Sequence, residues 1–360
     1  MRGLIDGLRD WGSRLPPFEL DWIQVEVSAR CLGACVYCPV SRYRGRRRED
    51  LMSMETFSRL EPAFESTDLV FLQGWGEPLV HPGLWGFVRR TRAAGSRVGF
   101  TTNGVLLDGK ERRAALESGL DVLGISLAGA TSGTHDRFRE GNSLETVDLH
   151  LTRLREEKQG LGSEKPHVHV AFLLLASNVH ELPAVLDLAQ KWGASQVVVS
   201  GLDLVLDPSL EEEALDSRPD LRPEVEARLH EARERAEALG MVLEANVVHP
   251  EGALLSCSEN VLRSCFVSAD GRVSPCVMAG TGVGADLGAT QWIGGRSYPL
   301  ESVVFGNIRE RPLEEIWRSR AARKFRGIFR DRIWKGGGAS EELPRICRHC
   351  RKLGMNGSRA

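Results

Sequence analysis

The sequence has no apolar run long enough to cross a bilayer, no excess of charge of either sign, and no repeated or low-complexity segment. Its 47 basic and 49 acidic side chains give a formal net charge of −2, which argues against a general nucleic-acid-binding surface. The N-terminus carries Asp6, Asp10 and Arg14, where a signal peptide has an uncharged core. These absences predict a cytoplasmic protein that binds neither membrane nor nucleic acid.

What the sequence does contain is eight cysteines in 360 residues. Thiols stay reduced in the cytoplasm, so these cysteines point to metal binding or catalysis rather than to disulfides. Three of them, Cys31, Cys35 and Cys38, stand at spacings of four and three. Three thiolates can hold three irons of a [4Fe–4S] cube and leave the fourth iron to an outside ligand. The amine and carboxylate of an amino acid would chelate that iron.

The stretch from Trp22 to about Val247 alternates short β-rich runs with segments of helical spacing. The expected strands are 23–27, 69–72, 97–101, 122–126, 168–174 and 196–200, and the longer expected helices include 110–118, 143–158, 180–192 and 222–239. Such alternation predicts βαβ units and a parallel sheet. The carboxyl ends of parallel strands share one rim, where ligands bind in such sheets. We expect the acidic stretch 207–216 to be a solvated loop.

Four segments that follow expected strands resemble, in order, motifs of the radical S-adenosylmethionine (radical SAM) superfamily. The first is the CxxxCxxC motif with Tyr37 before its last cysteine. The others are Gly74-Trp75-Gly76-Glu77-Pro78, similar to the family's GGEP segment, the loop Thr101–Gly104, and Ser126 with the downstream Arg139. The resemblance covers about residues 22–205. It implies an α/β fold, a partial (β/α)6 barrel over residues 22–248.

The resemblance also implies how these residues would be used. Gly74 and Gly76 would allow close backbone approach, and Glu77 would accept a hydrogen bond from the SAM ammonium group. The remaining SAM contacts would be Asn103, Ser126 and Arg139. In the family a reduced cluster passes one electron to SAM, which releases methionine and a 5′-deoxyadenosyl radical that takes hydrogen from the substrate. A flavodoxin or ferredoxin would be the electron donor; the sequence assigns no general acid or base.

A second set of cysteines lies in the last third of the chain. Cys265 and Cys276 flank an expected hairpin at Asp270-Gly271, and Cys347 and Cys350 form a CxxC pair. Two plus two thiolates can close a site for zinc or for a second [4Fe–4S] cluster, and the spacing does not choose between them.

The segment 306–317 between these pairs resembles the linker of the SPASM or twitch extensions of the same superfamily, and a basic helix is expected at 313–328. That resemblance implies an auxiliary [4Fe–4S] cluster held by Cys265, Cys276, Cys347 and Cys350, in a smaller α+β domain at 249–360 after an N-terminal segment at 1–21. No cysteine follows Cys350, so a second auxiliary cluster is not expected. The remaining Cys257 is interpreted as a buried thiol, as a ligand in place of Cys265, or as a reactive group near the substrate.

Five arginines within seven positions, Arg42, Arg44, Arg46, Arg47 and Arg48, follow the first cysteine cluster. They form either a solvated surface or a site for an anionic substrate, since guanidinium groups bind phosphate and carboxylate in pairs. This loop and the Phe71–Pro78 segment resemble maturases of tungsten-pterin aldehyde oxidoreductases, while peptide-modifying maturases and enzymes of small metabolites share the architecture. Two alternatives stay open: a zinc-stabilised α/β scaffold without radical chemistry, and an electron-transfer protein. The segments Gly74–Glu77 and Ser126–Arg139 argue against the electron-transfer protein, because electron transfer needs no pocket for an amino-acid ligand.

Overall fold

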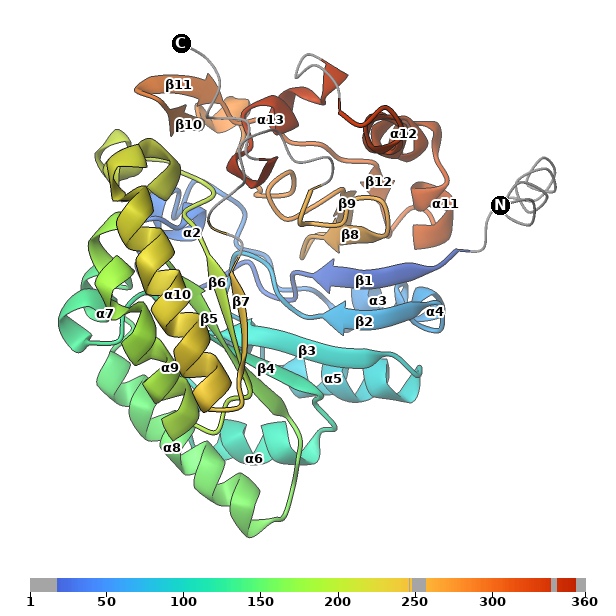
Figure 1. Cartoon of the computed structure of the whole chain (residues 1–360). Coiled ribbons are helices and arrows are strands. Elements are labelled where there is room, and N and C mark those ends of the chain that lie inside the picture. Colours follow the sequence, from blue (N-terminus) through green and yellow to red (C-terminus); the bar gives the residue numbers. More distant parts are fainter. Residues whose placement is uncertain (1–17, 246, 248–256, 338–341, 354–360) are drawn as a thin grey trace, which may run out of the picture.

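The computed structural model describes residues 18–245, 247, 257–337 and 342–353. Within these ranges one ten-stranded sheet has the order β12-β9-β8-β1-β2-β3-β4-β5-β6-β7 (Figure 1). Its parallel run is β1 (Leu20–Val25), β2 (Thr67–Phe71), β3 (Arg97–Thr102), β4 (Val122–Leu127), β5 (His167–Leu173), β6 (Gln196–Ser200) and β7 (Val242–Ala245). The first six strands lie within a few residues of the expected runs. The seventh was not predicted; it is only four residues long, and its exposed and partly buried residues alternate without a buried one.

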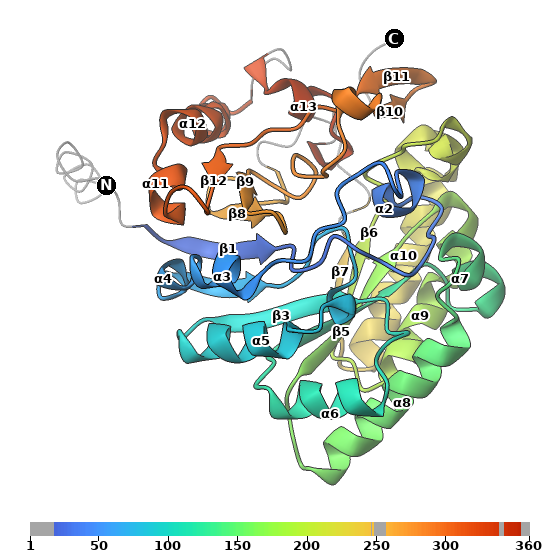
Figure 2. The ribbon, with the colours of Figure 1, turned by 180° about the vertical axis from the view of Figure 1, so that it is seen from behind.

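Helices connect these strands and cover the outer face of the curved sheet, as Figures 1 and 2 show from opposite sides. They are α3 (Met54–Ser58), α4 (Glu61–Phe64), α5 (Leu84–Ala93), α6 (Gly109–Glu117), α7 (Ser132–Phe138), α8 (Leu144–Gly160), α9 (Leu182–Lys191) and α10 (Arg222–Ala238). The short α2 (Pro39–Arg42) lies apart from them, at the carboxyl-end rim of the sheet (Figure 2). In α8 the buried residues Leu144, Val147, Leu151 and Leu154 recur at helical spacing and face the core. The partial (β/α)6 barrel expected from the sequence is therefore the observed core.

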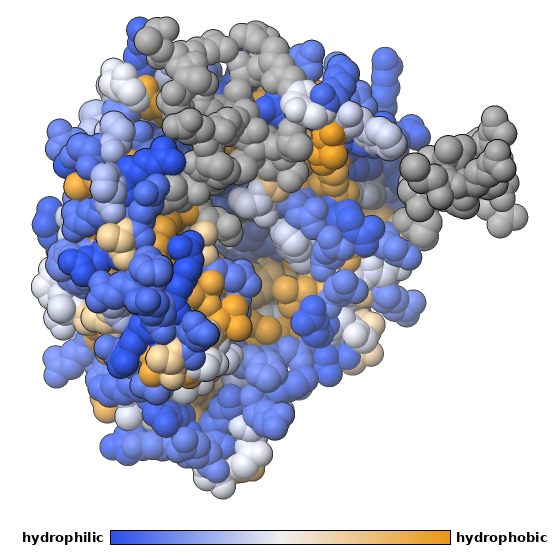
Figure 3. All heavy atoms as spheres, in the orientation of Figure 1, coloured by the Kyte–Doolittle hydropathy of each residue, from blue (hydrophilic) through white to orange (hydrophobic). Residues whose placement is uncertain are grey.

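The strands present alternate residues to the two sides of the sheet, as the pleat requires. In β5 the side chains of Val168, Val170 and Phe172 are buried among the helices, whereas His169 and Ala171 keep partial exposure on the inner face. The space-filling view shows apolar side chains gathered over the strands in the middle of this face, with hydrophilic residues around them (Figure 3). The inner face thus combines apolar walls with a few polar groups.

The C-terminal part continues the same sheet. β8 (Ser264–Val267) pairs in parallel with β1, and β9 (Arg272–Ser274) returns antiparallel to it, which confirms the expected hairpin. Gly271 in the turn has φ +87°, and a Cβ there would lie 2.7 Å from the Asn307 side-chain oxygen, so glycine is required. β12 (Gly306–Asn307) then pairs with β9, and β10 (Thr290–Ile293) with β11 (Arg296–Pro299) forms a separate hairpin. The proposed domain boundary near His249 lies outside the described residues.

The basic helix expected at 313–328 is in fact two helices, α11 (Leu313–Trp317) and α12 (Arg320–Trp334). The Ser319 side chain accepts a hydrogen bond from the Ala322 N–H and so caps the start of α12. The apolar periodicity continues across the break, so spacing alone did not reveal it. A last short helix, α13 (Arg345–Arg348), leads to the second CxxC cysteine.

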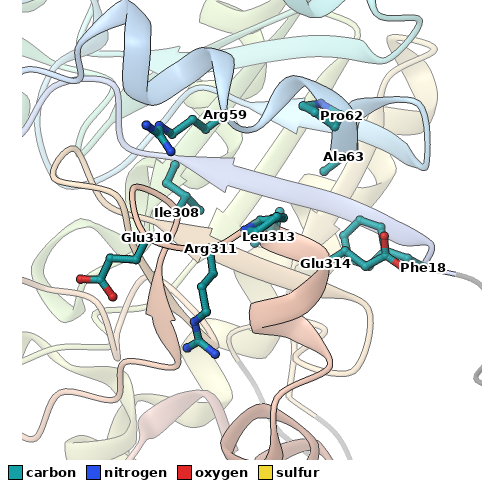
Figure 4. A pocket seen from close by; sticks show the side chains of 10 residues that line it. Phe18, Arg59, Pro62, Ala63, Ile308, Glu310, Arg311, Leu313 and Glu314 are labelled. Atoms are coloured by element: carbon teal, nitrogen blue, oxygen red, sulfur yellow. The ribbon is translucent and has the colours of Figure 1, made fainter.

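A cavity of about 240 Å³ lies between the core and the C-terminal part (Figure 4). Phe18 and Ala63 line it from one side and Ile308 and Leu313 from the other. Phe18 precedes β1 and Ala63 precedes β2, so this cavity lies at the amino ends of the strands. The motifs singled out in the sequence lie at the opposite, carboxyl-end rim.

Candidate functional site

The cysteine loop Cys31–Cys38 follows β1 and is held against the segment that follows α7. The main-chain N–H of Ala34 donates to the Glu140 carbonyl at 2.7 Å, and that of Val36 to the Phe138 carbonyl at 3.1 Å. Cys35 is buried, while Cys31 and Cys38 keep partial exposure, and all three thiols are free. The loop is therefore fixed by residues more than a hundred positions away.

The three thiols share one electrostatic environment. Burial, followed by the charges of the neighbouring Cys35 and Cys31, raises the pKa of the Cys38 thiol to about 12. Burial also raises the pKa of Cys31, followed by the charge of Glu77. Bare thiolates crowded in this way repel one another, and a cationic group between them would relieve the repulsion. These three thiols are thus suitable ligands for an iron–sulfur cluster.

The loop after β2 packs directly on the cysteine loop, and its glycines make this possible. A Cβ on Gly76 would lie 2.2 Å from the Ser28 carbonyl oxygen, and a Cβ on Gly74 would lie 2.3 Å from the Glu26 side chain. The N–H of Glu77 donates to the Arg30 carbonyl at 2.7 Å. Both glycines therefore allow the close approach of the two loops that was expected from the sequence.

We expect Gly76→Ala to destabilise the protein by about 1–3 kcal/mol, because the new methyl group overlaps main-chain atoms that cannot move freely. Thermal unfolding of the apoprotein measures this. Gly133→Ala is the matched control: Gly133 lies in α7 with nothing within 4 Å of its Cβ position, so alanine there should be neutral or slightly stabilising. Equal unfolding temperatures for the two variants would contradict the packing argument.

The buried carboxylate of Glu77 joins three pieces of the rim. Its Oε1 accepts from the Leu79 N–H at 3.1 Å and from the Thr102 hydroxyl at 2.7 Å, and its Oε2 accepts from the Asn103 N–H at 2.9 Å. Asn103 itself uses its side-chain oxygen to accept from the Val105 N–H, which closes a turn. A carboxylate has about four acceptor positions, so one on Oε2 stays available for a cation such as an ammonium group.

Arg139 is brought together with Tyr37 and Ser126, as the motif order suggested. Its Nη1 donates to the Tyr37 hydroxyl at 2.9 Å and its Nη2 to the Ser126 hydroxyl at 3.0 Å. The Arg139 side chain is almost fully buried, and its Nε has no hydrogen-bond partner among the residues that the structure describes. A buried guanidinium with an unused donor is a site for an anion, such as the carboxylate of an amino acid.

The sequence reasoning did not assign two buried amides that order this rim. Asn178 donates to the carbonyls of Ala128 and Leu173 and accepts from the Leu175 N–H, so it ties β4 to β5. Asn142 donates to the Arg139 carbonyl and to the Cys35 sulfur. No motif marks Asn142, and only the fold places it beside the cysteine loop.

The thiols of the second cysteine set do not all have the same charged neighbours. The pKa of Cys276 is raised mainly by burial and by the charge of Glu259. The thiols of Cys257 and Cys350 raise it as well. Burial, then Cys350 and Cys257, raise that of Cys347. The structure therefore brings Cys257 together with Cys276, Cys347 and Cys350.

Cys265 lies elsewhere. It is buried in β8 opposite Ile23 of β1, and the charge of Arg326 of α12 acts on its thiol. Burial raises its pKa to about 12 against the opposing effect of the Arg326 guanidinium. That guanidinium itself stacks 3.7 Å from the Trp317 ring centre. The structure does not place Cys265 with the other four thiols.

Charged residues next to Cys350 attach this second site to the core. The Lys352 ammonium lies 3.0 Å from a carboxylate oxygen of Asp203 and 3.0 Å from one of Glu259. Arg351 pairs with Asp216 and donates to the Trp292 carbonyl. The acidic stretch 207–216 was expected to be a solvated loop, but its Asp216 neutralises the charge of Arg351 where the second site meets the core.

The five arginines after the first cysteine loop all have protein partners. Arg42 pairs with Asp207, Arg44 donates to the Gly33 carbonyl, Arg46 to the Leu287 carbonyl, Arg47 to the carbonyls of Ala29 and Thr281, and Arg48 pairs with Asp270. Three of these partners belong to the C-terminal part. The arginines therefore join the two parts of the chain, while Arg42, Arg44, Arg46 and Arg48 also stay exposed.

Comparison with known proteins identifies the family. The radical SAM superfamily model matches residues 25–189, and that of SPASM, an iron–sulfur cluster-binding domain, matches residues 257–351. The chain is 23% identical over 322 residues to the tungsten-containing aldehyde ferredoxin oxidoreductase cofactor-modifying protein of Pyrococcus furiosus, covering 88% of this chain and 85% of that protein. It is 24% identical over 344 residues to the AdoMet-dependent heme synthase of Methanosarcina barkeri, covering 91% and 89%.

The fold agrees with these matches. The structure of Streptococcus suis SuiB bound to S-adenosylmethionine superposes with a TM-score of 0.65 at 12% identity, covering 91% of this chain and 72% of SuiB. No helix among the described residues is long and apolar enough to span a membrane. A radical SAM domain binds SAM at a [4Fe–4S] cluster, and a SPASM region holds auxiliary iron–sulfur clusters. The chain therefore has a radical SAM domain at residues 25–189 and a SPASM region at residues 257–351, and it is a radical SAM enzyme.

Proposed function

We propose that this radical SAM enzyme modifies a small cofactor precursor, with its radical chemistry started at the Cys31–Cys38 loop. The observation that carries the proposal is the juxtaposition of three free thiols, a buried carboxylate with one open acceptor position, and the buried Arg139 with an unused donor. Together these groups match the irons, the ammonium and the carboxylate of a cluster-bound amino-acid ligand. When bound, the reduced cluster and SAM supply a 5′-deoxyadenosyl radical that removes hydrogen from the substrate.

In this proposal Cys31, Cys35 and Cys38 ligate the cluster. Glu77 accepts a hydrogen bond from the SAM ammonium group, while Arg139 binds its carboxylate. Ser126 and Tyr37 hold the Arg139 guanidinium in place, and Asn103 keeps the Glu77 carboxylate oriented. Gly74 and Gly76 let the loop after β2 approach the cluster.

For the auxiliary cluster we propose Cys257, Cys276, Cys347 and Cys350 as ligands, with Cys257 in place of Cys265. The shared environment of these four thiols supports this choice, and so does the SPASM match, which begins at residue 257. Four thiolates leave no open iron, so the auxiliary cluster would serve as an electron carrier or a structural clip rather than bind substrate. The domains we propose are 1–21, 22–248 and 249–360.

The substrate class rests on the relatives that match most of both chains. One is described as a cofactor-modifying protein of a tungsten oxidoreductase, the other as a heme synthase. Both names belong to cofactor metabolism, which favours a small cofactor precursor over a peptide. Incubation with an iron porphyrin carboxylate, a pterin cofactor and a short peptide tests this choice, since a true substrate accelerates release of 5′-deoxyadenosine. Acceleration by the peptide alone would reject the cofactor assignment.

Anaerobic reconstitution with iron and sulfide tests the enzyme assignment itself. We expect about eight irons per chain, from two four-iron clusters, and an electron-spin-resonance change when SAM is added to the reduced protein. One zinc per chain without SAM cleavage would favour the scaffold alternative instead. Among the described residues no three His, Cys, Asp or Glu side chains converge closely enough to hold a single metal ion.

Glu77→Gln should weaken SAM binding about tenfold or more while leaving the iron content unchanged, because it removes the charge of one partner from a charge-assisted hydrogen bond. The amide keeps the size of the side chain and one acceptor for the Thr102 hydroxyl. Equilibrium binding of SAM to the reconstituted protein measures the change. An affinity equal to that of the unaltered enzyme would remove Glu77 from the SAM site.

A further inference from the structure

The Cys35 sulfur has a hydrogen-bond donor from a distant side chain. The Asn142 Nδ2 lies 3.5 Å from the Cys35 Sγ, across 107 positions of sequence. Asn142 is 2% exposed, so water does not compete for this contact. The two residues meet because the cysteine loop lies along the segment that follows α7, with main-chain hydrogen bonds at Ala34 and Val36.

The orientation of the Asn142 amide follows from its surroundings. The Nδ2 also donates to the Arg139 carbonyl at 3.2 Å and faces the Glu140 carbonyl at 3.5 Å. A flipped amide would place its oxygen against two carbonyl oxygens and a thiol, with no acceptor for the nitrogen. The N–H therefore points to sulfur, and the Oδ1 is buried without a partner in the structure.

Gly33 makes room for this contact. A Cβ on Gly33 would lie only 2.4 Å from the Asn142 Nδ2, so a larger residue in the loop would push the amide away. Gly141, with φ +79°, bends the chain just before Asn142, and a Cβ there would also approach Gly33. The two glycines and the amide form one close-packed contact.

The other two thiols receive their donors differently. The main-chain N–H groups that act on them are that of Gly33 for Cys31 and those of Val40 and Ser41 for Cys38. These N–H groups belong to the backbone of the loop and of α2, and a substitution to any residue other than proline leaves them in place. Cys35 has a side-chain donor, which a substitution can remove.

We infer that Asn142 sets the reduction potential of the cluster held by Cys31, Cys35 and Cys38, through its N–H···S hydrogen bond to Cys35. The inference rests on the proposed function, which places the cluster there. One-electron reduction adds negative charge to the cluster and its sulfurs, and an N–H donor in a buried site stabilises that added charge. Hydrogen bonds to the sulfurs are among the factors that set cluster potentials, so losing this one makes reduction harder.

The experiment is a redox titration of reconstituted Asn142→Leu followed by electron-spin resonance. Leucine has a similar size and no donor. We expect the ratio of reduced to oxidised SAM-binding cluster to fall about tenfold at a fixed solution potential, which is 59 mV for one electron. The auxiliary cluster, held by other cysteines, provides an internal reference whose potential should not move. Asn142→Asp should lower the ratio at least as far, since it adds a negative charge.

Ser143→Ala is the matched control. Ser143 is the next residue and caps α8 through the Thr146 N–H, so its loss disturbs the same segment without touching sulfur. It should leave the potential unchanged. A purely structural role for Asn142 would lower iron content or thermal stability in Asn142→Leu but leave the potential of the remaining cluster where it was, and that result would overturn the inference.

A measurement on the unaltered side chain keeps the test independent of folding. Protein labelled with nitrogen-15 in asparagine should show a weakly coupled nitrogen in pulsed resonance of the reduced cluster, and Asn142→Leu or Asn142→Ser should lose it. No such coupling in the unaltered protein would overturn the inference while leaving the proposed function intact. Absence of any SAM-sensitive cluster in the unaltered protein would overturn both.

Discussion

Protein with Cys38→Ala should release no 5′-deoxyadenosine above background when it is reduced in the presence of SAM. Cys38 ends the cysteine loop, and without it only two thiolates remain for a cube that needs three from the protein. The iron content should fall from about eight to about four per chain, because the auxiliary site keeps its own thiols. Product analysis and iron determination on the same anaerobic sample measure both effects.

The iron that stays in the auxiliary cluster distinguishes the loss of one cluster from a failure to fold. If Cys38→Ala lost all iron, the variant would have failed to fold, and its circular dichroism and thermal unfolding should then differ from those of the unaltered protein. Nucleoside release at the full rate from a folded variant would show that Cys38 does not ligate the cluster. The neighbouring Tyr37 hydroxyl, which accepts from Arg139, should stay in place, because the loop is held by main-chain hydrogen bonds at Ala34 and Val36.

Cys257→Ala should lose the auxiliary cluster, whereas Cys265→Ala should keep it. Cys257 shares its surroundings with Cys276 and Cys350, so its loss should remove about four irons per chain and abolish turnover that needs the second cluster. Cys265 is buried in β8 beside Arg326, so its replacement should keep about eight irons and cost only stability, about 1 kcal/mol.

The pair is a direct comparison because both positions lie within ten residues of each other and both changes remove one thiol. Iron and sulfide content, together with the resonance of the auxiliary cluster, decide between them. Iron loss in Cys265→Ala with a full complement in Cys257→Ala would restore the ligand set expected from the sequence. In that case the arrangement of thiols around Cys276 would have a structural role only.

The strands and helices of the core could be predicted because their apolar periods are strong. In β5 and α8 the buried residues recur at the spacing that each element requires, and the expected strands agree with the observed ones within a few residues. Elements with weak local signals were missed. β7 is four residues long with none of them buried, and the break between α11 and α12 depends on the cap at Ser319.

The motif loops were predictable for a different reason. Gly76 follows β2 and Ser126 lies at the end of β4, and a parallel sheet brings such ends to one rim whatever the details of packing. Contacts between segments that lie far apart in the sequence were not predictable. The partners of the arginine loop, among them Asp207 and Asp270, come from distant segments, and their choice depends on how the C-terminal part packs on the core.

The sequence by itself determined the superfamily, the order of the motifs and the three-cysteine loop, because each of these depends on local spacing and on the chemistry of residue types. Tertiary structure alone decided that Cys257 lies with Cys276 and that Cys265 lies apart from them. It also decided that Asn142 reaches Cys35. The physical reason is distance along the chain: these contacts join segments whose approach is set by the packing of many other residues, and short-range sequence patterns carry no information about that packing.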